Sequence, residues 1–251
     1  MNFVINATKS IFCLGKISSF QRHSQGTTMD KFTLPEPPGR FAFPIASAGY
    51  PFIFAAAFTT SVFAMLQLQT LALIGLAVTF FIAFFFRDPD RVVTIADRAV
   101  ISPADGKIVI AGNIEHSPFY DGPCQKVSIF MSVFNVHVNR IPHDGKIERI
   151  AYHPGKFLNA AFDKASDDNE RNAVFVTTGS GQRYCVVQIA GLIARRIICH
   201  LQDGEIVYRG RRFGLICFGS RLDVYLPIDT ALQVSVGDRV QAGTSIIGYF
   251  G

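Results

Sequence analysis

The stretch from Arg212 to Pro227, Arg-Phe-Gly-Leu-Ile-Cys-Phe-Gly-Ser-Arg-Leu-Asp-Val-Tyr-Leu-Pro, decides how the chain is understood. An apolar run ends at Gly219-Ser220, and an alternating run from Leu222 to Leu226 follows. These two patterns predict two β-strands. A Gly-Ser pair between two strands is ordinarily a turn or a bulge, so this pair by itself indicates no chemistry.

The region around this stretch has the pattern of a β domain. From Val92 onward, short runs rich in Val and Ile alternate with Gly, Asp and Pro, which predicts a mainly antiparallel β domain. The run 236–243, Val-Gly-Asp-Arg-Val-Gln-Ala-Gly, is similar to the turns of biotinyl/lipoyl-type folds. We therefore expect a mainly β (α+β) fold of barrel-sandwich or lipoyl-like character. Its strands include 107–111, 126–131, 173–177, 184–189 and 195–199.

An uncharged segment precedes the β domain. Residues 41–86 contain no Asp, Glu, Lys or Arg, and a single membrane span needs about 20 residues. The weak polar break at 67–70 predicts two helices near 51–66 and 68–86. The second is the better candidate for spanning, because Pro44, Gly49 and Pro51 interrupt the start of the first. A hairpin that only dips into the bilayer and a buried pair of core helices are the alternatives.

The charge content indicates which environment and partners the protein has. Only 17% of its 251 residues are charged, below the roughly 25% of soluble domains. The net charge of +5 suits anionic lipid, and no basic stripe with interleaved aromatics indicates nucleic acid. Arg40 and Arg87 flank the uncharged segment and favour a hairpin with both ends on the cytoplasmic side. Five cysteines without a Cys-x-x-Cys pair argue against a disulfide framework and a zinc site.

Three divisions of the chain follow from these patterns. Residues 1–40 are an N-terminal extension and linker, 41–86 the membrane-associated helical hairpin, and 87–251 the catalytic β domain. The first 28 residues lack acidic side chains, which suits a targeting presequence. An over-extended start is the interpretation we favour, because Met29 would begin the chain equally well.

Three motifs in a fixed order carry a resemblance. They are Ser102-Pro-Ala-Asp-Gly-Lys-Ile108, Asn135-Val-His-Val-Asn-Arg140 and the surroundings of Gly219-Ser220. In these motifs, over about residues 87–251, the chain resembles the phosphatidylserine decarboxylases, and is closest to their shorter bacterial branch. The resemblance implies that the Gly219–Ser220 bond breaks itself and that Ser220 becomes a pyruvoyl group. Fragments 1–219 and 220–251 would remain together as a heterodimer, with further oligomerisation open.

The resemblance also implies roles for single residues. Ser220 would attack the carbonyl of Gly219, His137 would act as general base, and Asp105 would orient and charge a histidine, as in a Ser-His-Asp arrangement. The longer bacterial and parasite enzymes have a His-x-x-His pair, whose second position is Arg140 here. Either His137 serves both self-processing and the later turnover, or the processing base is another residue.

Further residues are candidates for the base or for substrate binding. The reserve bases are His143 and His153. Arg140 is a candidate for holding the lipid phosphate or the substrate carboxylate. The candidate headgroup contacts are Lys156, Lys164 and Arg171.

The pyruvoyl group explains how amino-acid decarboxylation is achieved without pyridoxal phosphate. By resemblance, the amine of phosphatidylserine forms a Schiff base with it, CO₂ leaves, and phosphatidylethanolamine is released; such electron sinks are normally cofactors. The acidic residues in 163–170 do not match a calcium loop. We expect neither pyridoxal phosphate nor a metal, and we expect the enzyme at the inner cell membrane with its catalytic domain on the cytoplasmic face.

Two other classes of function are alternatives. A membrane-tethered lipoyl-like carrier module predicts a modified lysine at a hairpin tip, where this chain has Asp238-Arg239. A membrane-anchored zinc peptidase requires paired histidines at metal-binding spacing. The six histidines provide no such pair; they are His23, His116, His137, His143, His153 and His200.

Overall fold

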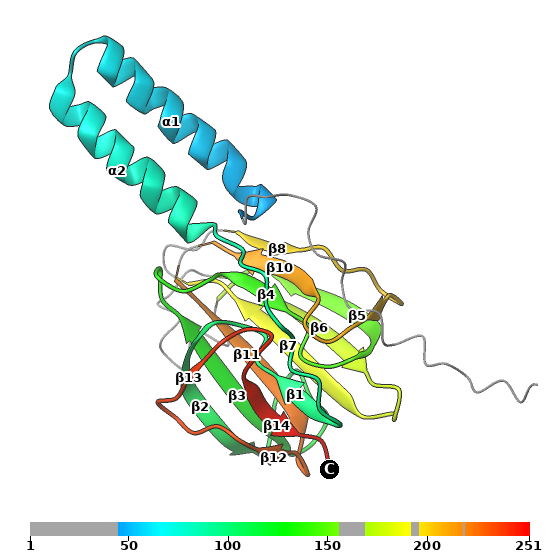
Figure 1. Cartoon of the computed structure of the whole chain (residues 1–251). Coiled ribbons are helices and arrows are strands. Elements are labelled where there is room, and N and C mark those ends of the chain that lie inside the picture. Colours follow the sequence, from blue (N-terminus) through cyan, green and yellow to red (C-terminus); the bar gives the residue numbers. More distant parts are fainter. Residues whose placement is uncertain (1–44, 156–168, 192–195, 218) are drawn as a thin grey trace, which may run out of the picture. The chain divides into compact units, whose positions relative to one another are not determined.

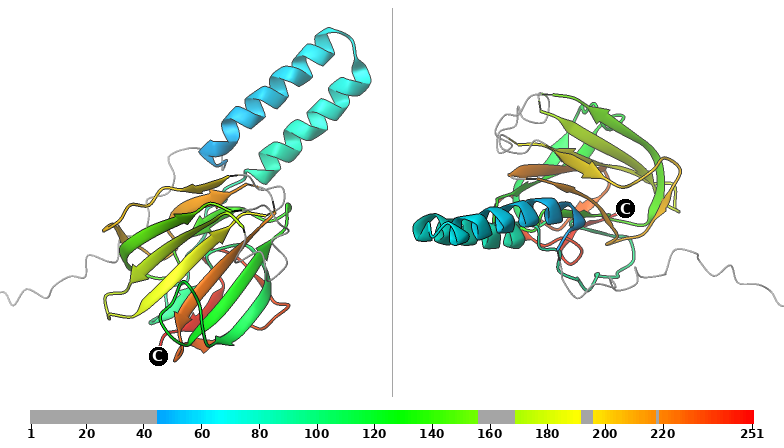
Figure 2. Two further views of the ribbon diagram at one scale, coloured as in Figure 1. Left: turned by 180° about the vertical axis from the view of Figure 1, so that it is seen from behind. Right: turned by 90° about the horizontal axis from the view of Figure 1, so that it is seen from above.

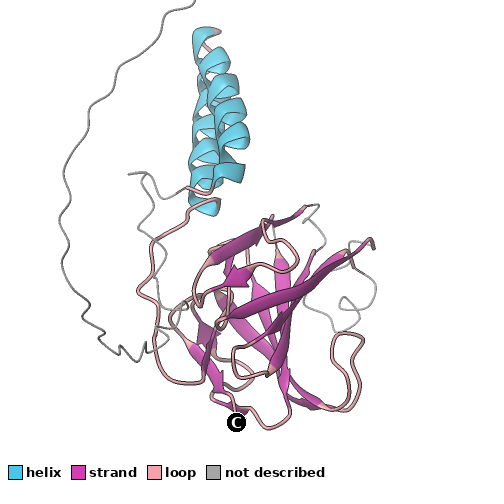
Figure 3. Ribbon diagram, turned by 90° about the vertical axis from the view of Figure 1, so that its right-hand side faces the viewer, coloured by secondary structure: helices cyan, strands magenta, loops and turns pink. Residues whose placement is uncertain are grey.

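The computed structural model describes residues 45–155, 169–191, 196–217 and 219–251 (Figure 1). A 3₁₀ turn, Ser47–Gly49, leads into α1 (Tyr50–Met65), and α2 (Gln69–Phe85) returns antiparallel to it (Figure 3). The rest of the described chain is strands and loops. The prediction of a mainly β fold behind a helical hairpin is therefore confirmed. The N-terminal extension, 1–40, lies outside the described residues.

Helix α1 has the length that the sequence predicted, but the 3₁₀ turn before it extends the helical segment. Ser47–Met65 is a continuous apolar helical segment of 19 residues, long enough to cross a membrane, whereas α2 has 17 residues. Our expectation that the second helix is the better spanning candidate was wrong. Pro51 lies in the first turn of α1, where a helix needs no N–H from it and its fixed φ suits the helix, so it does not shorten the helix.

The two helices pack closely at small side chains. A Cβ atom added at Gly75 would lie 2.6 Å from Oγ1 of Thr60, so glycine allows α2 to approach α1 there. The hydroxyl oxygens of Thr60 and Thr79 are 3.4 Å apart across the hairpin. Most of the large apolar side chains on both helices face outward and are exposed.

The strands form three antiparallel sheets within the described residues. The largest is a curled sheet in the order β13-β2-β3-β11-β7-β6-β5-β9 (Figure 2). The smaller sheets have the orders β4-β10-β8 and β1-β14-β12. The strand bounds are β1 Ala99–Ile101, β2 Gly106–Ile114, β3 Cys124–Met131, β4 Val138–Arg140, β5 Gly145–His153, β6 Arg171–Thr177, β7 Arg183–Ile189, β8 Ile197–Cys199, β9 Ile206–Val207, β10 Arg212–Ile216, β11 Ser220–Pro227, β12 Ala231–Leu232, β13 Arg239–Val240 and β14 Ile246–Tyr249.

The main core joins the three sheets. Strand β11 lies between β3 and β7 and alternates, because successive side chains of a strand point to opposite faces. Leu222, Val224 and Leu226 belong to the main core together with residues of β10 and β14. The opposite face of β11 carries Arg221, Asp223 and Tyr225.

That opposite face holds a buried ion pair. The guanidinium of Arg221 contacts both oxygens of Asp223, with Nε 2.6 Å from Oδ1 and Nη2 2.9 Å from Oδ2. Nζ of Lys126 lies 3.2 Å from Oδ2. Arg221 and Asp223 are fully buried. Burial alone raises the pKa of a carboxyl, but the two cations outweigh it and hold the pKa of Asp223 below its ordinary value.

Removing one partner of this pair leaves a buried charge without compensation. We expect Asp223→Ala to lower the free energy of unfolding by about 3–5 kcal/mol at pH 7, measured by denaturant unfolding of the full chain in detergent. Asp121→Ala, in an exposed loop, is the control and should change it by less than about 0.5 kcal/mol. A loss below about 1 kcal/mol for Asp223→Ala contradicts this account.

The contribution of Asp223 to the free energy of unfolding depends on pH in a definite direction. The folded-state pKa of Asp223 lies below the unfolded value of about 3.9. The wild type therefore keeps the contribution at neutral pH and loses it as the pH falls below about 3.9 through the folded pKa. The gap between wild type and Asp223→Ala should close only in that acid range.

Candidate active site

The Gly219-Ser220 pair lies where the chain passes from one sheet to another. Strand β10 belongs to the small sheet with β4 and β8, and β11 begins at Ser220 in the large curled sheet. Gly219 has φ of +49°, in the left-handed region that favours glycine. Apart from its chain neighbours, no described residue has a heavy atom within 4 Å of the place where a Cβ of residue 219 would be. The bend thus needs glycine and leaves open space beside it.

Ser220 is fully buried at the first position of β11. Its register partner across the sheet is Met131, the last residue of β3. Its Oγ has no hydrogen-bond partner among the described residues. Buried polar groups are nearly always hydrogen-bonded, so an unpartnered hydroxyl beside a left-handed glycine indicates a reactive position.

His137 has the geometry of a neutral base. Its Nδ1 lies 3.0 Å from the carbonyl oxygen of Asn135. Because a carbonyl only accepts, we assign the proton to Nδ1, which leaves the lone pair on Nε2. That Nε2 is buried and without a hydrogen-bond partner among the described residues. Burial, opposed by the Asn135 contact and assisted by the charge of Arg87, lowers the pKa of His137 to about 4.

The loop that carries His137 is braced by its own side chains. Oδ1 of Asn135 accepts hydrogen bonds from the backbone N–H and the hydroxyl of Ser132, at 2.9 and 2.8 Å. The N–H of Asn135 donates to the carbonyl of Ser132 at 2.9 Å. The carbonyl of Asn135 is thereby fixed where it orients the imidazole, so Asn135 is a site residue that the sequence analysis missed.

Strand pairing brings His137 and Ser220 to the same region. Val138 pairs with Leu215 of β10, and Ser220 pairs with Met131. The amide nitrogen of Asn139 donates to the sulfur of Met131 at 3.7 Å. The two side chains are not hydrogen-bonded to each other here, which is common before a reactive complex forms.

Asp105 does not contact His137 in this structure. Its Oδ2 lies 2.8 Å from Nη2 of Arg91, and its Oδ1 accepts a hydrogen bond from the N–H of Ala242 at 2.8 Å. The role of orienting a histidine, which the resemblance assigns to Asp105, is taken here by the carbonyl of Asn135. Through Arg91 and Ala242, Asp105 instead holds the segment that follows α2 against the β domain. We call this its fastening role.

Arg140 has a similar fastening role. Its guanidinium donates to the carbonyls of Gly210 and Pro89, at 2.9 and 3.1 Å, and lies 3.7 Å from Asp88. Asp88 is also paired with Arg212 at 2.8 Å. Arg140 is almost completely buried. These contacts favour a positioning role for it over the expected contact with a lipid phosphate.

The remaining candidates are Arg171, the two reserve bases and two lysines. Arg171 begins β6, and its guanidinium is 5.5 Å from the ring centre of Phe119. Nδ1 of His143 contacts the carbonyl of Asp144 at 3.0 Å, and the ring of His153 lies 6.2 Å from that of Phe119, so neither reserve base is placed at Ser220. Lys156 and Lys164 lie outside the described residues.

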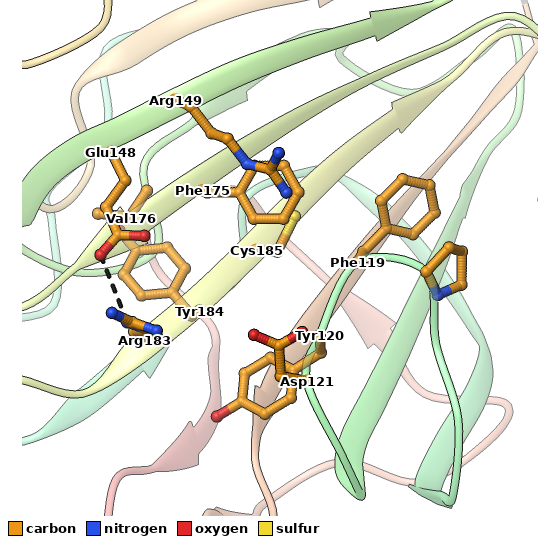
Figure 4. A pocket seen from close by; sticks show the side chains of 11 residues that line it. Phe119, Tyr120, Asp121, Glu148, Arg149, Phe175, Val176, Arg183, Tyr184 and Cys185 are labelled. Carbon is orange, nitrogen blue, oxygen red and sulfur yellow. Dashed lines mark ion pairs between the residues drawn. The ribbon is translucent and has the colours of Figure 1, made fainter.

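A pocket of about 310 Å³ is separate from this site (Figure 4). It lies between the loop around Phe119 and strands β5, β6 and β7. Arg149 stacks over the ring of Phe175 at 4.2 Å, and Arg183 is paired with Glu148 at 3.4 Å. Neither Ser220 nor His137 lines it.

Comparison with known proteins decides the family. A family profile described as phosphatidylserine decarboxylase matches residues 78–248. The chain belongs to the phosphatidylserine decarboxylase family. It is 49% identical over 208 residues to the phosphatidylserine decarboxylase proenzyme of Syntrophus aciditrophicus, covering 82% of this chain and 97% of that one.

Other relatives agree. The proenzyme of the same name from Desulfotalea psychrophila is 51% identical over 205 residues, covering 82% of this chain and 96% of the relative. The one from Burkholderia mallei is 49% identical over 208 residues, covering 81% and 94%. The resemblance stated from the motifs is confirmed, and the protein is a carboxy-lyase of this family. The relatives' names also identify them as proenzymes.

The fastening role of Asp105 makes a measurable prediction. Asp105→Asn and Arg91→Gln each remove one end of the same ion pair, so their effects on the free energy of unfolding should not add. We expect a coupling of about 0.5–3 kcal/mol in a double-mutant cycle on the full chain. The pair Asp105→Asn and Asp203→Asn serves as the control. Additive effects at positions 91 and 105, within about 0.5 kcal/mol, contradict this role.

Proposed function

We propose that the protein is a self-processing, pyruvoyl-dependent decarboxylase that converts phosphatidylserine to phosphatidylethanolamine and CO₂. The observation that carries the proposal is the buried hydroxyl of Ser220, which follows a left-handed Gly219 and has no hydrogen-bond partner in the described part of the chain. A neutral base, His137, lies on a neighbouring segment, and its Nε2 likewise has no partner among the residues that the structure describes. The family match supports the decarboxylase reaction.

The first stage of self-processing moves an acyl group. Nε2 of His137 accepts the proton of the Ser220 hydroxyl, and Oγ attacks the carbonyl carbon of Gly219. The C–N bond breaks as the C–O bond forms, and the nitrogen of Ser220 leaves as an amine after taking a proton. An ester now joins Gly219 to the side chain of Ser220.

The second stage divides the chain. A base removes the α-proton of residue 220. The bond between its Cβ and Oγ then breaks, and Gly219 departs as a carboxylate that keeps Oγ. Residue 220 is then a dehydroalanine, and one water molecule converts it to a pyruvoyl group with release of ammonia. The open space beside Gly219 provides room for the change of geometry at its carbonyl.

The surroundings of Ser220 fit a pyruvoyl group. When formed, that group serves as the electron sink that decarboxylation of an amino acid requires. Ser220 is fully buried, which separates the reacting group from bulk water. We also assign to His137 the holding and return of a proton during decarboxylation, so it is the candidate base for both self-processing and turnover.

The two fragments are expected to remain one protein. Strand β11 is paired along its length with β3 and, over Arg221–Tyr225, with β7. Strand β14 pairs with β1, and β13 pairs with β2. A piece of about 32 residues is too short for a core of its own, so fragment 220–251 stays embedded in fragment 1–219.

The substrate and the hairpin indicate a membrane location. Exposed apolar side chains on α1 and α2 suit the interior of a bilayer. Arg87, at the end of α2, and Arg40, outside the described residues, suit a cytoplasmic face of the inner membrane. Arg171 and Lys164 are the candidates for the anionic headgroup.

Replacement of the nucleophile tests the processing. We expect wild-type protein to give two species in intact-mass spectrometry under denaturing conditions, divided between Gly219 and Ser220. The smaller should be lighter than its encoded mass by one ammonia. Ser220→Ala should give one chain of full length and no CO₂ from phosphatidylserine, whereas Ser235→Ala, in the same fragment, should behave like wild type. Cleavage of Ser220→Ala at this bond excludes Ser220 as the nucleophile.

Charges on the hairpin test the membrane location. Phe58 and Leu73 are 72% and 68% exposed on α1 and α2. An aspartate at each costs about 2.5–3.5 kcal/mol in a bilayer, so the variant Phe58→Asp/Leu73→Asp should move from the membrane fraction to the soluble fraction. The matched control places aspartate at Ile228 and Val236, which are exposed in the β domain. Equal fractionation of the two variants contradicts the hairpin's role.

A further inference from the structure

The end of the membrane helix α2 lies against the imidazole of His137. Phe85, the last residue of α2, is fully buried. Its ring centre is 4.3 Å from that of His137, and the two planes are inclined by 37°. This is the distance of an aromatic pair in direct contact. The helix therefore reaches the base that the proposed self-processing uses.

An aromatic chain continues from this contact into the hairpin. The rings of Phe85 and Phe86 meet edge to face at 5.0 Å. Phe86 then stacks on Phe52 of α1 at 5.6 Å. A Cβ atom added at Gly49 would lie 2.6 Å from Phe86, so there is little room for Phe86 to move. The contacts of Phe86 with Phe85 and with Phe52 of α1 thus restrict the position of the Phe85 ring.

A second contact joins α2 to the loop of His137. The guanidinium of Arg87 donates to the carbonyl of Phe84 at 2.8 Å and to the carbonyl of Phe134 at 2.7 Å. Phe134 lies within the loop that Ser132 and Asn135 brace. The end of α2 therefore contacts this loop at two points, the backbone carbonyl of Phe134 and the imidazole of His137.

The same apolar cluster reaches the segment before the cleavage site. The cluster includes Val136 and Val138, the residues on either side of His137 in the sequence. It also includes Cys217, which lies two residues before Gly219. Its buried members are Phe85, Phe86, Val136, Val138, Leu215 and Cys217. One packed unit thus contacts the base, its loop and the chain that leads to Ser220.

We propose that Phe85 is a positioning residue for His137, so that the membrane helix α2 forms one wall of the processing site. Its ring fixes the orientation of the imidazole and excludes water from it. This inference rests on the proposed function, because it assigns His137 to self-processing.

The electrostatic surroundings of His137 support this. Burial is the main reason that its pKa is lowered to about 4; the Asn135 carbonyl opposes that shift and the Arg87 charge adds to it. Among the described residues, Arg87 is the ionisable group with a resolved influence on it. Removing the Phe85 ring exposes the imidazole and should bring its pKa back toward about 6.5.

The test is the pH profile of self-cleavage in the full chain, synthesised into vesicles of anionic and zwitterionic phospholipid. The wild-type rate should change little between pH 8 and pH 5.5. Phe85→Ala should cleave about tenfold more slowly at pH 5.5 than at pH 8, because an imidazole of pKa about 6.5 is then mostly protonated. Phe85→Tyr keeps the ring and should restore the wild-type profile. Phe80→Ala, on the exposed side of α2, is the matched control.

A conservative variant separates orientation from exclusion of water. Phe85→Leu keeps an apolar cover but lacks a planar ring. It should lower the rate at every pH without moving the midpoint. This variant also keeps the inference testable if Phe85→Ala does not fold, because leucine fills most of the same volume.

A direct titration is independent of cleavage. In unprocessed Ser220→Ala chains with isotope-labelled histidine in micelles, the His137 signal is assigned by its loss in His137→Gln. It should not titrate above pH 5, and it should titrate near pH 6.5 when Phe85→Ala is added. Wild-type protein that never cleaves overturns the proposed function. Wild-type cleavage with unmoved titrations and an unchanged rate in Phe85→Leu overturns this inference alone.

Discussion

The pairing of β11 with β3 on one side and β7 on the other is the constraint on which the candidate site depends. It fixes Ser220 at the first position of the strand, opposite Met131. The buried pair of Arg221 and Asp223 prevents a change of register, because a shift by one residue would turn both charges into the apolar core. The position of the Ser220 hydroxyl thus follows from strand register, and the bend at Gly219 follows from the change of sheet just before it.

Most of the fold could be predicted from the sequence because its longer elements have clear patterns. The uncharged segment predicts the two helices to within about two residues, and the Val- and Ile-rich runs predict β2, β3, β6 and β7. The strands of two or three residues, such as β9 and β13, are too short to show alternation. The capacity of the first helical segment to span a membrane was underestimated, because a proline normally breaks a helix, whereas Pro51 lies in the first turn of α1 and a 3₁₀ turn precedes it.

The site was predicted only as far as its side chains form motifs. Gly219, Ser220 and His137 stand in family-like motifs, so the resemblance identifies them. The carbonyl of Asn135 could not be predicted, because every residue has a backbone carbonyl and only the loop geometry aims this one at His137. Phe85 gave no signal either, since one phenylalanine in an apolar run is indistinguishable from its lipid-facing neighbours. The contact of Asp105 with Arg91 was missed for the opposite reason: the motif suggested a histidine as its partner.

The order of the strands along the chain has a consequence for biosynthesis. Strand β11, which begins at Ser220, pairs with β3 and β7, which come earlier in the chain, while the later strands β13 and β14 pair with β2 and β1. A ribosome must therefore release nearly the whole chain before the strands around the Gly219–Ser220 bond can assemble. Under the proposed self-processing, a chain that lacks these last strands would keep its serine unchanged. Self-processing would then act as a check on folding, because a polypeptide would acquire the reactive carbonyl group only once these strands are in place.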